Sequence, residues 1–85
     1  MFSYVYVLFS KKDRKFYVGK TKNLKIRFED HCNGRVPSTC NRRPLSLVYY
    51  EACRNSKDSD KREKYLKTSY GKHYLRSRLK SYFTG

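Results

Sequence analysis

Two tyrosines, an arginine and a glutamate are the residues of this chain best suited to chemistry on an anion. The phenols of Tyr6 and Tyr17 can transfer protons, although a phenol with a pKa of about 10 is a weak base at neutral pH. The guanidinium of Arg27 can bind two oxygens of one anion, and its charge would favour a nearby phenolate. The carboxylate of Glu63 is a ligand for a hard divalent cation.

The N-terminal part of the chain must position the tyrosines. Residues 2–9 are β-branched and aromatic and predict a strand. Residues 10–15 predict a polar turn, and residues 16–19 predict a short return strand. Together these segments indicate a β-hairpin that carries both phenols.

The register of this hairpin decides whether the tyrosines meet. If Leu8 faces Tyr17, then Tyr6 faces Gly19, and the two tyrosines become diagonal neighbours about 7–8 Å apart. A slip of one residue would place them on opposite faces. We expect Gly19 to leave open space beside Tyr6, as a site requires.

The remaining elements give the predicted order β-β-α-β-α-α. They are a helix from about Asn23 to about Cys32, a loop over 35–44, a strand over 45–53, a helix from Ser56 or Ser59 to about Ser69, and a helix over 72–82. Gly71 is expected to interrupt the last two helices. In the third strand, alternation should place Leu45, Leu47 and Tyr49 on one face.

The first helix contains a stripe of mixed chemistry. Arg27 and His31 are one turn apart and share helical spacing with Leu24 and Phe28. A charged side chain in such a stripe lies at the edge of the core or points into a cleft.

Charge indicates the class of partner. The chain has 85 residues and a net charge of +14, from 21 Lys and Arg against 7 Asp and Glu. Residues 11–27 hold eight basic and one acidic residue, and residues 57–80 hold nine basic and three acidic residues. These two blocks contain Tyr17, Arg27 and Glu63, and they predict a polyanionic partner, most simply nucleic acid.

Several other classes are disfavoured. The longest apolar run, Tyr4–Phe9, is too short to span a membrane, and no signal-peptide pattern opens the chain. Cys32, Cys40 and Cys53 have spacings of 8 and 13 residues, which match neither a disulfide scaffold nor a zinc motif. We expect one domain over residues 1–85, located in the cytoplasm and associated with the nucleoid if it acts on DNA.

The order of these motifs resembles one known family. Tyr4-Val5-Tyr6, ten residues, and then Tyr17-Val18-Gly19 resemble the GIY-YIG nuclease domain. The resemblance extends to about Lys67, and the stretch from Asn41 to Glu51 is similar to the small stand-alone branch of the family. It implies an α/β (α+β) fold, in which helices flank a small three-stranded antiparallel sheet.

The resemblance also implies a phosphodiester-cleaving site with one divalent metal ion, Mg²⁺ or Mn²⁺. Tyr6 and Tyr17 would include the base that takes a proton from the attacking water. Tyr17 is favoured because Lys20, which should lie beside the tyrosines, is close in sequence; Tyr6 is the alternative. Gly19 would allow close packing.

Three further roles come from the same resemblance. Arg27 would hold the scissile phosphate, and Glu63 would bind the metal ion. His31 matches a histidine that some members place near the tyrosine or the phosphate. A structural reading of each residue also exists: the tyrosines could be sheet packing, Arg27 a surface residue with a buried stem, and Glu63 a helix charge paired with Lys67.

The chain departs from the family pattern at two positions. Tyr4 stands where Gly is usual. Many members also have an Asn about a dozen residues after the metal-binding Glu, and here that position is Leu75. The missing hydrogen bond could come from Ser69 or His73.

The predicted function is a metal-dependent DNA endonuclease that is structure-selective or weakly specific, with a role in DNA repair or recombination. Its substrate would be double-stranded or branched DNA, with RNA as an alternative, and a protein partner could supply targeting. The other readings are an inactive nucleic-acid-binding module and a ribosome-associated basic protein. Residues expected to contact backbone phosphates are Lys11, Lys12, Arg14, Lys15, Lys22, Arg42 and Arg43.

Overall fold

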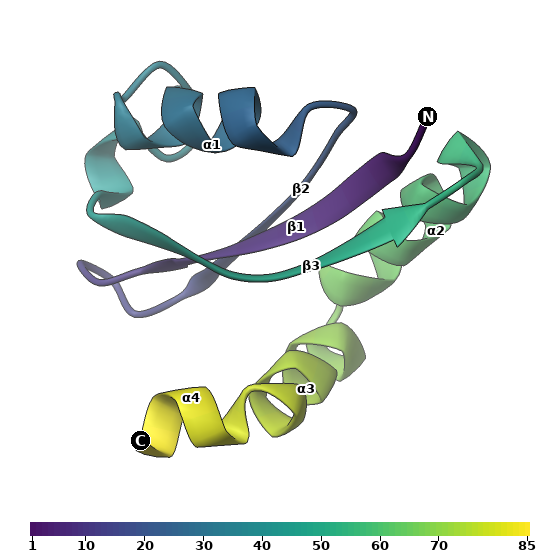
Figure 1. Cartoon of the computed structure of the whole chain (residues 1–85). Coiled ribbons are helices and arrows are strands. Elements are labelled where there is room, and N and C mark those ends of the chain that lie inside the picture. Colours follow the sequence, from purple (N-terminus) through teal and green to yellow (C-terminus); the bar gives the residue numbers. More distant parts are fainter.

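The apolar segment near the N-terminus forms the central strand of a three-stranded antiparallel sheet. A computed structural model describes residues 1–85 and shows β1 (Ser3–Ser10) between β2 (Phe16–Thr21) and β3 (Leu45–Cys53). The helices are α1 (Leu24–Cys32), α2 (Ser56–Leu66), α3 (Ser69–Arg78) and α4 (Lys80–Thr84), and a short 3₁₀ turn, η1, covers Cys40–Arg42 (Figure 1). The predicted α+β class and the element order through α3 are confirmed.

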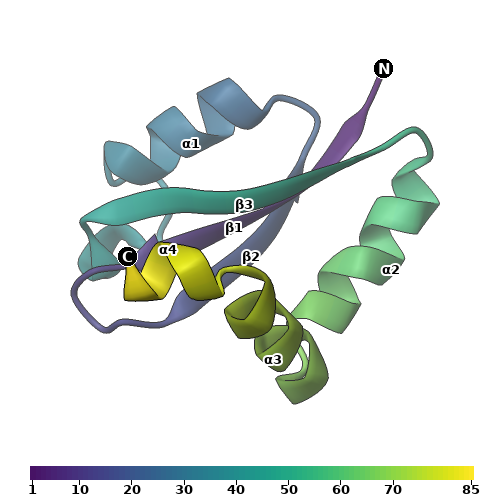
Figure 2. The same cartoon turned by 60° about the horizontal axis from the view of Figure 1, so that its bottom comes forward.

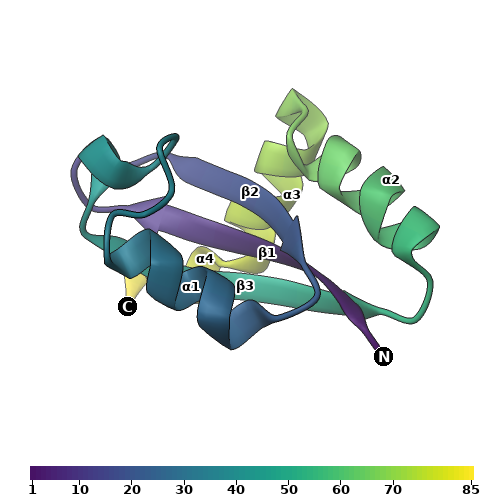
Figure 3. The ribbon, with the colours of Figure 1, turned by 90° about the horizontal axis from the view of Figure 1, so that it is seen from above.

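The helices lie in two layers on opposite faces of the sheet. α1 covers one face, and α2, α3 and α4 lie across the other (Figures 1 and 2). Viewed from above, α1 lies over β1 and β3 and leaves β2 in view (Figure 3). β2 is therefore an edge strand that α1 covers less fully than it covers β1 and β3.

The alternation along β1 supplies a small core to each layer. Val5 and Val7 pack with Leu66 and Leu75 beneath α2 and α3, whereas Tyr6 and its partners pack beneath α1. All five of these side chains are at most 1 % exposed. Strand periodicity thus places the side chain of Tyr6 on the face of the sheet that α1 covers.

Of the two registers that the sequence left open, the hairpin has the one that brings the tyrosines together. Tyr6 pairs with Gly19 and Leu8 pairs with Tyr17. The side chains of Tyr6 and Tyr17 consequently lie on the same face, beneath α1.

The expected alternation along β3 is wrong beyond its first residues. The pairing of β1 with β3 shifts between Val7 and Leu8, so a β-bulge changes which residues share a face. Leu47 packs beneath α1, but Tyr49 packs against the opposite core and bonds Tyr74 of α3. A bulge is not visible in a run of alternating apolar residues, which is why the sequence predicted one continuous face.

The expected boundaries of the C-terminal helices also need correction. Thr68, not Gly71, separates α2 from α3, because its hydroxyl accepts a hydrogen bond from the Gly71 amide and caps α3. Gly71 lies inside α3, where it is buried against the backbone of Leu66 at the end of α2. The last predicted helix is divided near Leu79 into α3 and α4. No helix in the structure has the length and apolar character needed to cross a membrane.

Candidate active site around two paired tyrosines

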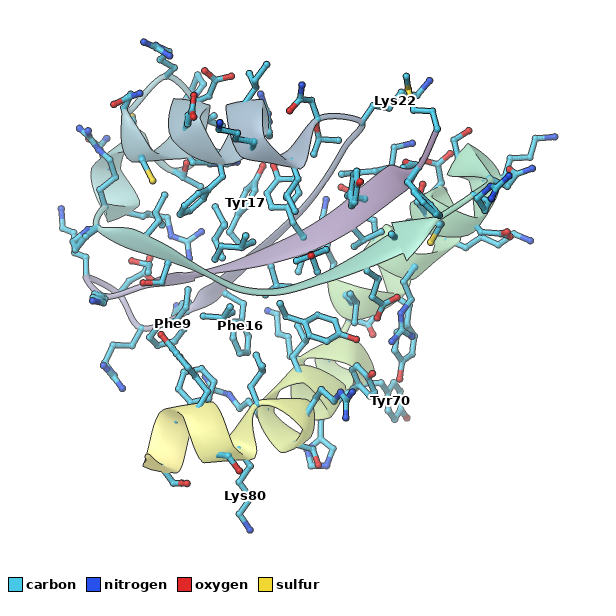
Figure 4. The ribbon with its side chains drawn as sticks, viewed as in Figure 1. Phe9, Phe16, Tyr17, Lys22, Tyr70 and Lys80 are labelled. Carbon is cyan, nitrogen blue, oxygen red and sulfur yellow. The ribbon has the colours of Figure 1, made fainter.

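Tyr6 and Tyr17 form the centre of the candidate site. Their ring centroids lie 6.4 Å apart, on adjacent strands. Tyr6 is 1 % exposed, whereas Tyr17 is partly exposed at the open β2 side (Figure 4). The space expected beside Gly19 is filled by the phenol of Tyr6, which a Cβ at Gly19 would strike. Gly19 therefore permits close packing and does not create an opening.

α1 brings Arg27 and His31 to the hydroxyl of Tyr6. Nε of Arg27 donates to Tyr6 Oη at 3.4 Å, and Nε2 of His31 lies 2.8 Å from the same oxygen. The α1 N-terminus is fixed by Asn23, whose side chain accepts a hydrogen bond from the Ile26 amide. The two polar residues of the predicted stripe on this helix, Arg27 and His31, thus both contact the hydroxyl of Tyr6. The terminal nitrogens of Arg27 make no hydrogen bond in the structure, so they are free to bind an anion.

His31 is held from its other side by Thr39. Nδ1 of His31 lies 2.7 Å from Thr39 Oγ1, and both side chains are 0 % exposed. The His31 ring also meets the Tyr17 ring edge-on, with centroids 5.1 Å apart. These contacts leave a buried row of hydrogen-bonding groups that runs from Thr39 through His31 to Tyr6.

Burial sets the charge states along this row. Burial lowers the pKa of His31 from 6.5 to about 4, and the positive charge of Arg27 acts in the same direction. His31 is therefore a neutral imidazole at pH 7. Burial also raises the pKa of Tyr6, against the hydrogen bond from Arg27, which lowers it. Negative charge on Tyr17 or Glu63 would raise the Tyr6 pKa further.

Glu63 reaches this region from α2. Its carboxylate is 24 % exposed and lies 3.3 Å from Nζ of Lys67, the helix pair that the alternative reading predicted. It is also near enough for its charge to act on the pKa of Tyr6. No group of three or more His, Cys, Asp and Glu side chains is arranged to hold a metal ion. A single carboxylate fits Mg²⁺ or Mn²⁺ only if water and substrate oxygens complete the ligand set, as Mg²⁺ commonly requires.

The expected place of Lys20 beside the tyrosines is wrong. Lys20 follows Gly19 on β2, so its side chain leaves the opposite face of the strand. There its ammonium forms an ion pair with Asp60 of α2. The reason for preferring Tyr17 as the base depended on Lys20 and therefore fails. Strand parity, applied to the same register, could have revealed this.

The two residues named as substitutes for the missing Asn do not act as substitutes. Leu75 is fully buried in the core beneath α2 and α3. Ser69 and His73 are exposed, and neither side chain makes a hydrogen bond. The tyrosine cluster is therefore built without that supporting group.

The two arginines of the 35–44 loop that were expected to contact phosphate, Arg42 and Arg43, have structural partners. Arg42 bonds both carboxylate oxygens of Asp13, at 2.5 and 3.3 Å, and the carbonyls of Lys15 and Phe16, each at 3.3 Å. Arg43 donates to two carbonyls and packs against Gly34, whose φ is +75°. Arg43 thus fixes the loop to the end of α1. Fewer of its N–H groups are therefore available to a phosphate than the sequence predicted.

The remaining expected phosphate contacts lie at two places on the surface. Those of the hairpin turn are exposed, and they are Lys11, Lys12, Arg14 and Lys15. Lys22 (Figure 4) lines the largest surface groove, which has a volume of about 520 Å³ and lies between the start of α1 and β3. That groove contains neither paired tyrosine, nor Arg27, nor Glu63, so size alone does not locate the chemistry.

The sequence did not identify three polar residues with partners among the expected site residues: Ser38, whose hydroxyl donates to Tyr17 Oη at 3.4 Å, Thr39 and Asp60. Thr39 lies in a proline-containing loop, where no periodicity marks a buried position. Asp60 lies on α2 one turn before Glu63, and this helical spacing could have indicated that the two carboxylates share one face of α2.

Comparison with known proteins agrees with this geometry. The family model described as the GIY-YIG catalytic domain matches residues 2–76. A UPF0213 protein of Clostridium perfringens is 41% identical over 66 residues, which are 76% of this chain and 70% of that protein. A UPF0213 protein of Pediococcus acidilactici, from the ldhD 5′ region, is 38% identical over 79 residues, 86% and 76% of the two chains.

A solved structure also resembles this fold. The solution NMR structure of a UPF0213 protein from Bacillus halodurans has a TM-score of 0.57 and 30% sequence identity. The match covers 91% of this chain and 84% of that one. The motif, the chain fold and the tyrosine cluster therefore point to the same group of proteins.

Proposed function

Because the chain belongs to the GIY-YIG nuclease family, we propose that it is a metal-dependent endonuclease that hydrolyses phosphodiester bonds of DNA. The observation that carries the proposal is the convergence of Arg27 and His31 on the hydroxyl of Tyr6, with Tyr17 beside them. A net charge of +14 supports a nucleic-acid substrate. We further propose that the protein is weakly sequence-specific or selects DNA by its structure, and that it acts in DNA repair or recombination.

Tyr6 is the proposed general base, and His31 assists it. The neutral His31 can accept the phenol proton at Nε2 while Tyr6 takes a proton from the attacking water. This direction requires Nδ1–H of His31 to donate to Thr39, whose hydroxyl can accept it. The terminal nitrogens of Arg27 bind the scissile phosphate and stabilise the charge that develops on it. Tyr17, at the open side, orients the water or the phosphate.

Glu63 is the proposed ligand of the divalent metal ion. When bound, such an ion supplies Lewis-acid stabilisation of phosphoryl oxygens. The chain's part is to provide the carboxylate and to release it from Lys67, its partner in the structure. Only one protein carboxylate is involved, so we expect weak metal binding in the absence of DNA.

A cleavage assay with matched variants tests the proposal. Purified protein is incubated with plasmid, branched and flap DNA in the presence of Mg²⁺ or Mn²⁺. We expect Tyr6→Phe and Glu63→Gln to reduce the cleavage rate by about 10²-fold or more, because each removes a group that acts in the transition state. Tyr70→Phe is the control, since Tyr70 is 79% exposed on α3 (Figure 4). DNA binding in EDTA should survive all three changes. Cleavage at the wild-type rate by both site variants would refute the assignment.

An inactive nucleic-acid-binding module is the second candidate function. The observation in its favour is Leu75, which occupies the core where many family members have an Asn, with no group in its place. Tight, salt-sensitive DNA binding without cleavage under either metal would select this candidate.

A further inference from the structure

A second basic pocket lies outside the tyrosine site. It has a volume of about 320 Å³ and is lined by Lys15, Phe16, Arg42, Lys72 and Arg76. These residues come from the hairpin, the 3₁₀ turn η1 and α3, which are distant in sequence. Four of the five carry positive charge, and none carries negative charge.

Most of this charge has no partner within the protein. Among the four cations, only Arg42 forms an ion pair, with Asp13. Arg76 lies over the rings of Phe16 and Phe83, at 5.3 and 5.9 Å from their centroids, and makes no hydrogen bond. A guanidinium stacked in this way keeps its N–H edge directed outward, ready for phosphate oxygens. The three cations that have no ion pair, Lys15, Lys72 and Arg76, repel one another, and a bound polyanion would remove that repulsion.

The pocket and the tyrosine site lie on opposite faces of the same edge strand. Phe16 and Tyr17 are successive residues of β2, so their side chains leave opposite faces (Figure 4). Arg42 bonds the carbonyls of Lys15 and Phe16, which places it at the start of the same strand. Because β2 is the outer strand in the order β2-β1-β3, no further strand separates the two sites at this edge.

This placement restricts the shape of a substrate that uses both sites. A straight duplex lying on the α1-side face of β2 cannot also contact the opposite face of the strand. DNA that bends sharply or branches at the edge can contact both. Phosphate contacts of this kind position the nucleic acid without reading its sequence.

We propose that Lys15, Lys72 and Arg76 form a second phosphate-binding site, whose wall Arg42 completes. This site holds the backbone of a separate arm of branched DNA when the tyrosine site holds the scissile strand. That these residues bind phosphate is inferred from the pocket itself. That they hold an arm of the DNA being cleaved rests on the proposed function. It makes branched DNA the preferred substrate.

Binding in EDTA tests the pocket without cleavage. Fluorescence anisotropy compares a labelled three-armed DNA with a linear duplex of equal length for the wild type and Lys72→Gln/Arg76→Gln. We expect the double variant to bind the three-armed DNA at least fivefold more weakly and the linear duplex almost as the wild type does. Its plot of log affinity against log salt for the three-armed DNA should be shallower by about 2, or about 1 for each lost phosphate contact.

Two further variants control for general loss of charge and for loss of stability. Lys57→Gln/Lys61→Gln removes the same charge from exposed positions of α2, and it should leave the preference for three-armed DNA unchanged. Lys72→Glu leaves the stacked Arg76 intact, so it should reproduce the loss even if the double variant is destabilised. Equal losses by the pocket and control variants, or equal losses on both DNAs, would overturn the inference.

The result remains distinct from a failure of the proposed function. If the protein binds DNA and the pocket variants behave like the control, only the second site is refuted. If Tyr6→Phe and Glu63→Gln both leave cleavage unchanged, the catalytic assignment fails, whatever the pocket does.

Discussion

At the scale of single residues, the site depends on one polar side chain, His31, being kept neutral in the interior. Such a residue is costly to bury unless both ring nitrogens have partners. Tyr6 and Thr39 provide these partners, at 2.8 and 2.7 Å. Thr39 can accept a hydrogen bond from Nδ1–H, and that tautomer leaves Nε2 of His31 as an acceptor for the phenol of Tyr6, which is the arrangement that the proposed proton transfer needs.

Stability at low pH should report this burial. The pKa of His31 is about 4 in the folded protein and 6.5 in the unfolded chain, so the unfolded chain binds more protons between these values. The free energy of unfolding should therefore fall as the pH drops from about 7 to about 4, with His31 contributing about 3 kcal/mol to the fall. Chemical denaturation of the wild type and His31→Gln at pH 7.5 and 4 measures the difference.

The exposed His73 supplies the control for this measurement. His73→Gln should lose as much stability as the wild type between the two pH values, whereas His31→Gln should lose about 3 kcal/mol less. An equal loss in wild type and His31→Gln would mean that His31 titrates normally and is not held neutral by burial.

At the scale of elements, α2 must be fixed for the charge of Glu63 to act on Tyr6. Arg62 makes three hydrogen bonds of 2.9–3.0 Å to Glu51 of β3, and Lys20 pairs with Asp60. The buried Leu66 packs into the core shared with α3. The end of α2 is therefore located by its contact with α3, at Gly71.

The close contact at Gly71 predicts a stability loss on substitution. A Cβ at this position would press on the backbone of Leu66 and the carbonyl of Tyr65, and backbone atoms cannot swing aside. We expect Gly71→Ala to lower the free energy of unfolding by about 1–3 kcal/mol from overpacking, even though alanine favours a helix by up to about 1 kcal/mol. Urea denaturation measures this change. Ser77→Ala, at an exposed position of the same helix, should change stability by less than about 0.5 kcal/mol, and a stabilised Gly71→Ala protein would contradict the close contact.

The same elements show how far sequence reasoning reaches. The hairpin was predictable, and alternation with a short turn left few registers open, one of which pairs Tyr6 with Gly19 as the structure does. The bulge opposite Val7 and the inward turn of Thr39 were not, because each depends on contacts between distant segments. Gly71 was misassigned as a helix break because the sequence shows its flexibility but not its close neighbour.

At the scale of the whole molecule, the charge surrounds the edge strand and is not confined to one face. The chain has principal extents of 33 × 29 × 21 Å and carries a net charge of +14. Arg27 presents charge on the α1 side of β2, and the second basic pocket presents it on the α3 side. Both faces of the strand would therefore attract phosphate.

The salt dependence of DNA binding should reveal how many of these charges meet phosphate. If Arg27, Lys15, Lys72 and Arg76 each contact one phosphate of a branched DNA, the plot of log affinity against log salt has a slope of about −3.6. Affinity then falls roughly 100-fold between 50 and 200 mM salt. Two branched DNAs of unrelated sequence should give the same slope, because phosphate contacts carry no sequence information. Glu63→Gln, which removes a negative charge and no cation, should leave the slope unchanged. A slope shallower than about −1 would mean that a single phosphate contact suffices for binding, which is incompatible with backbone held on both sides of β2.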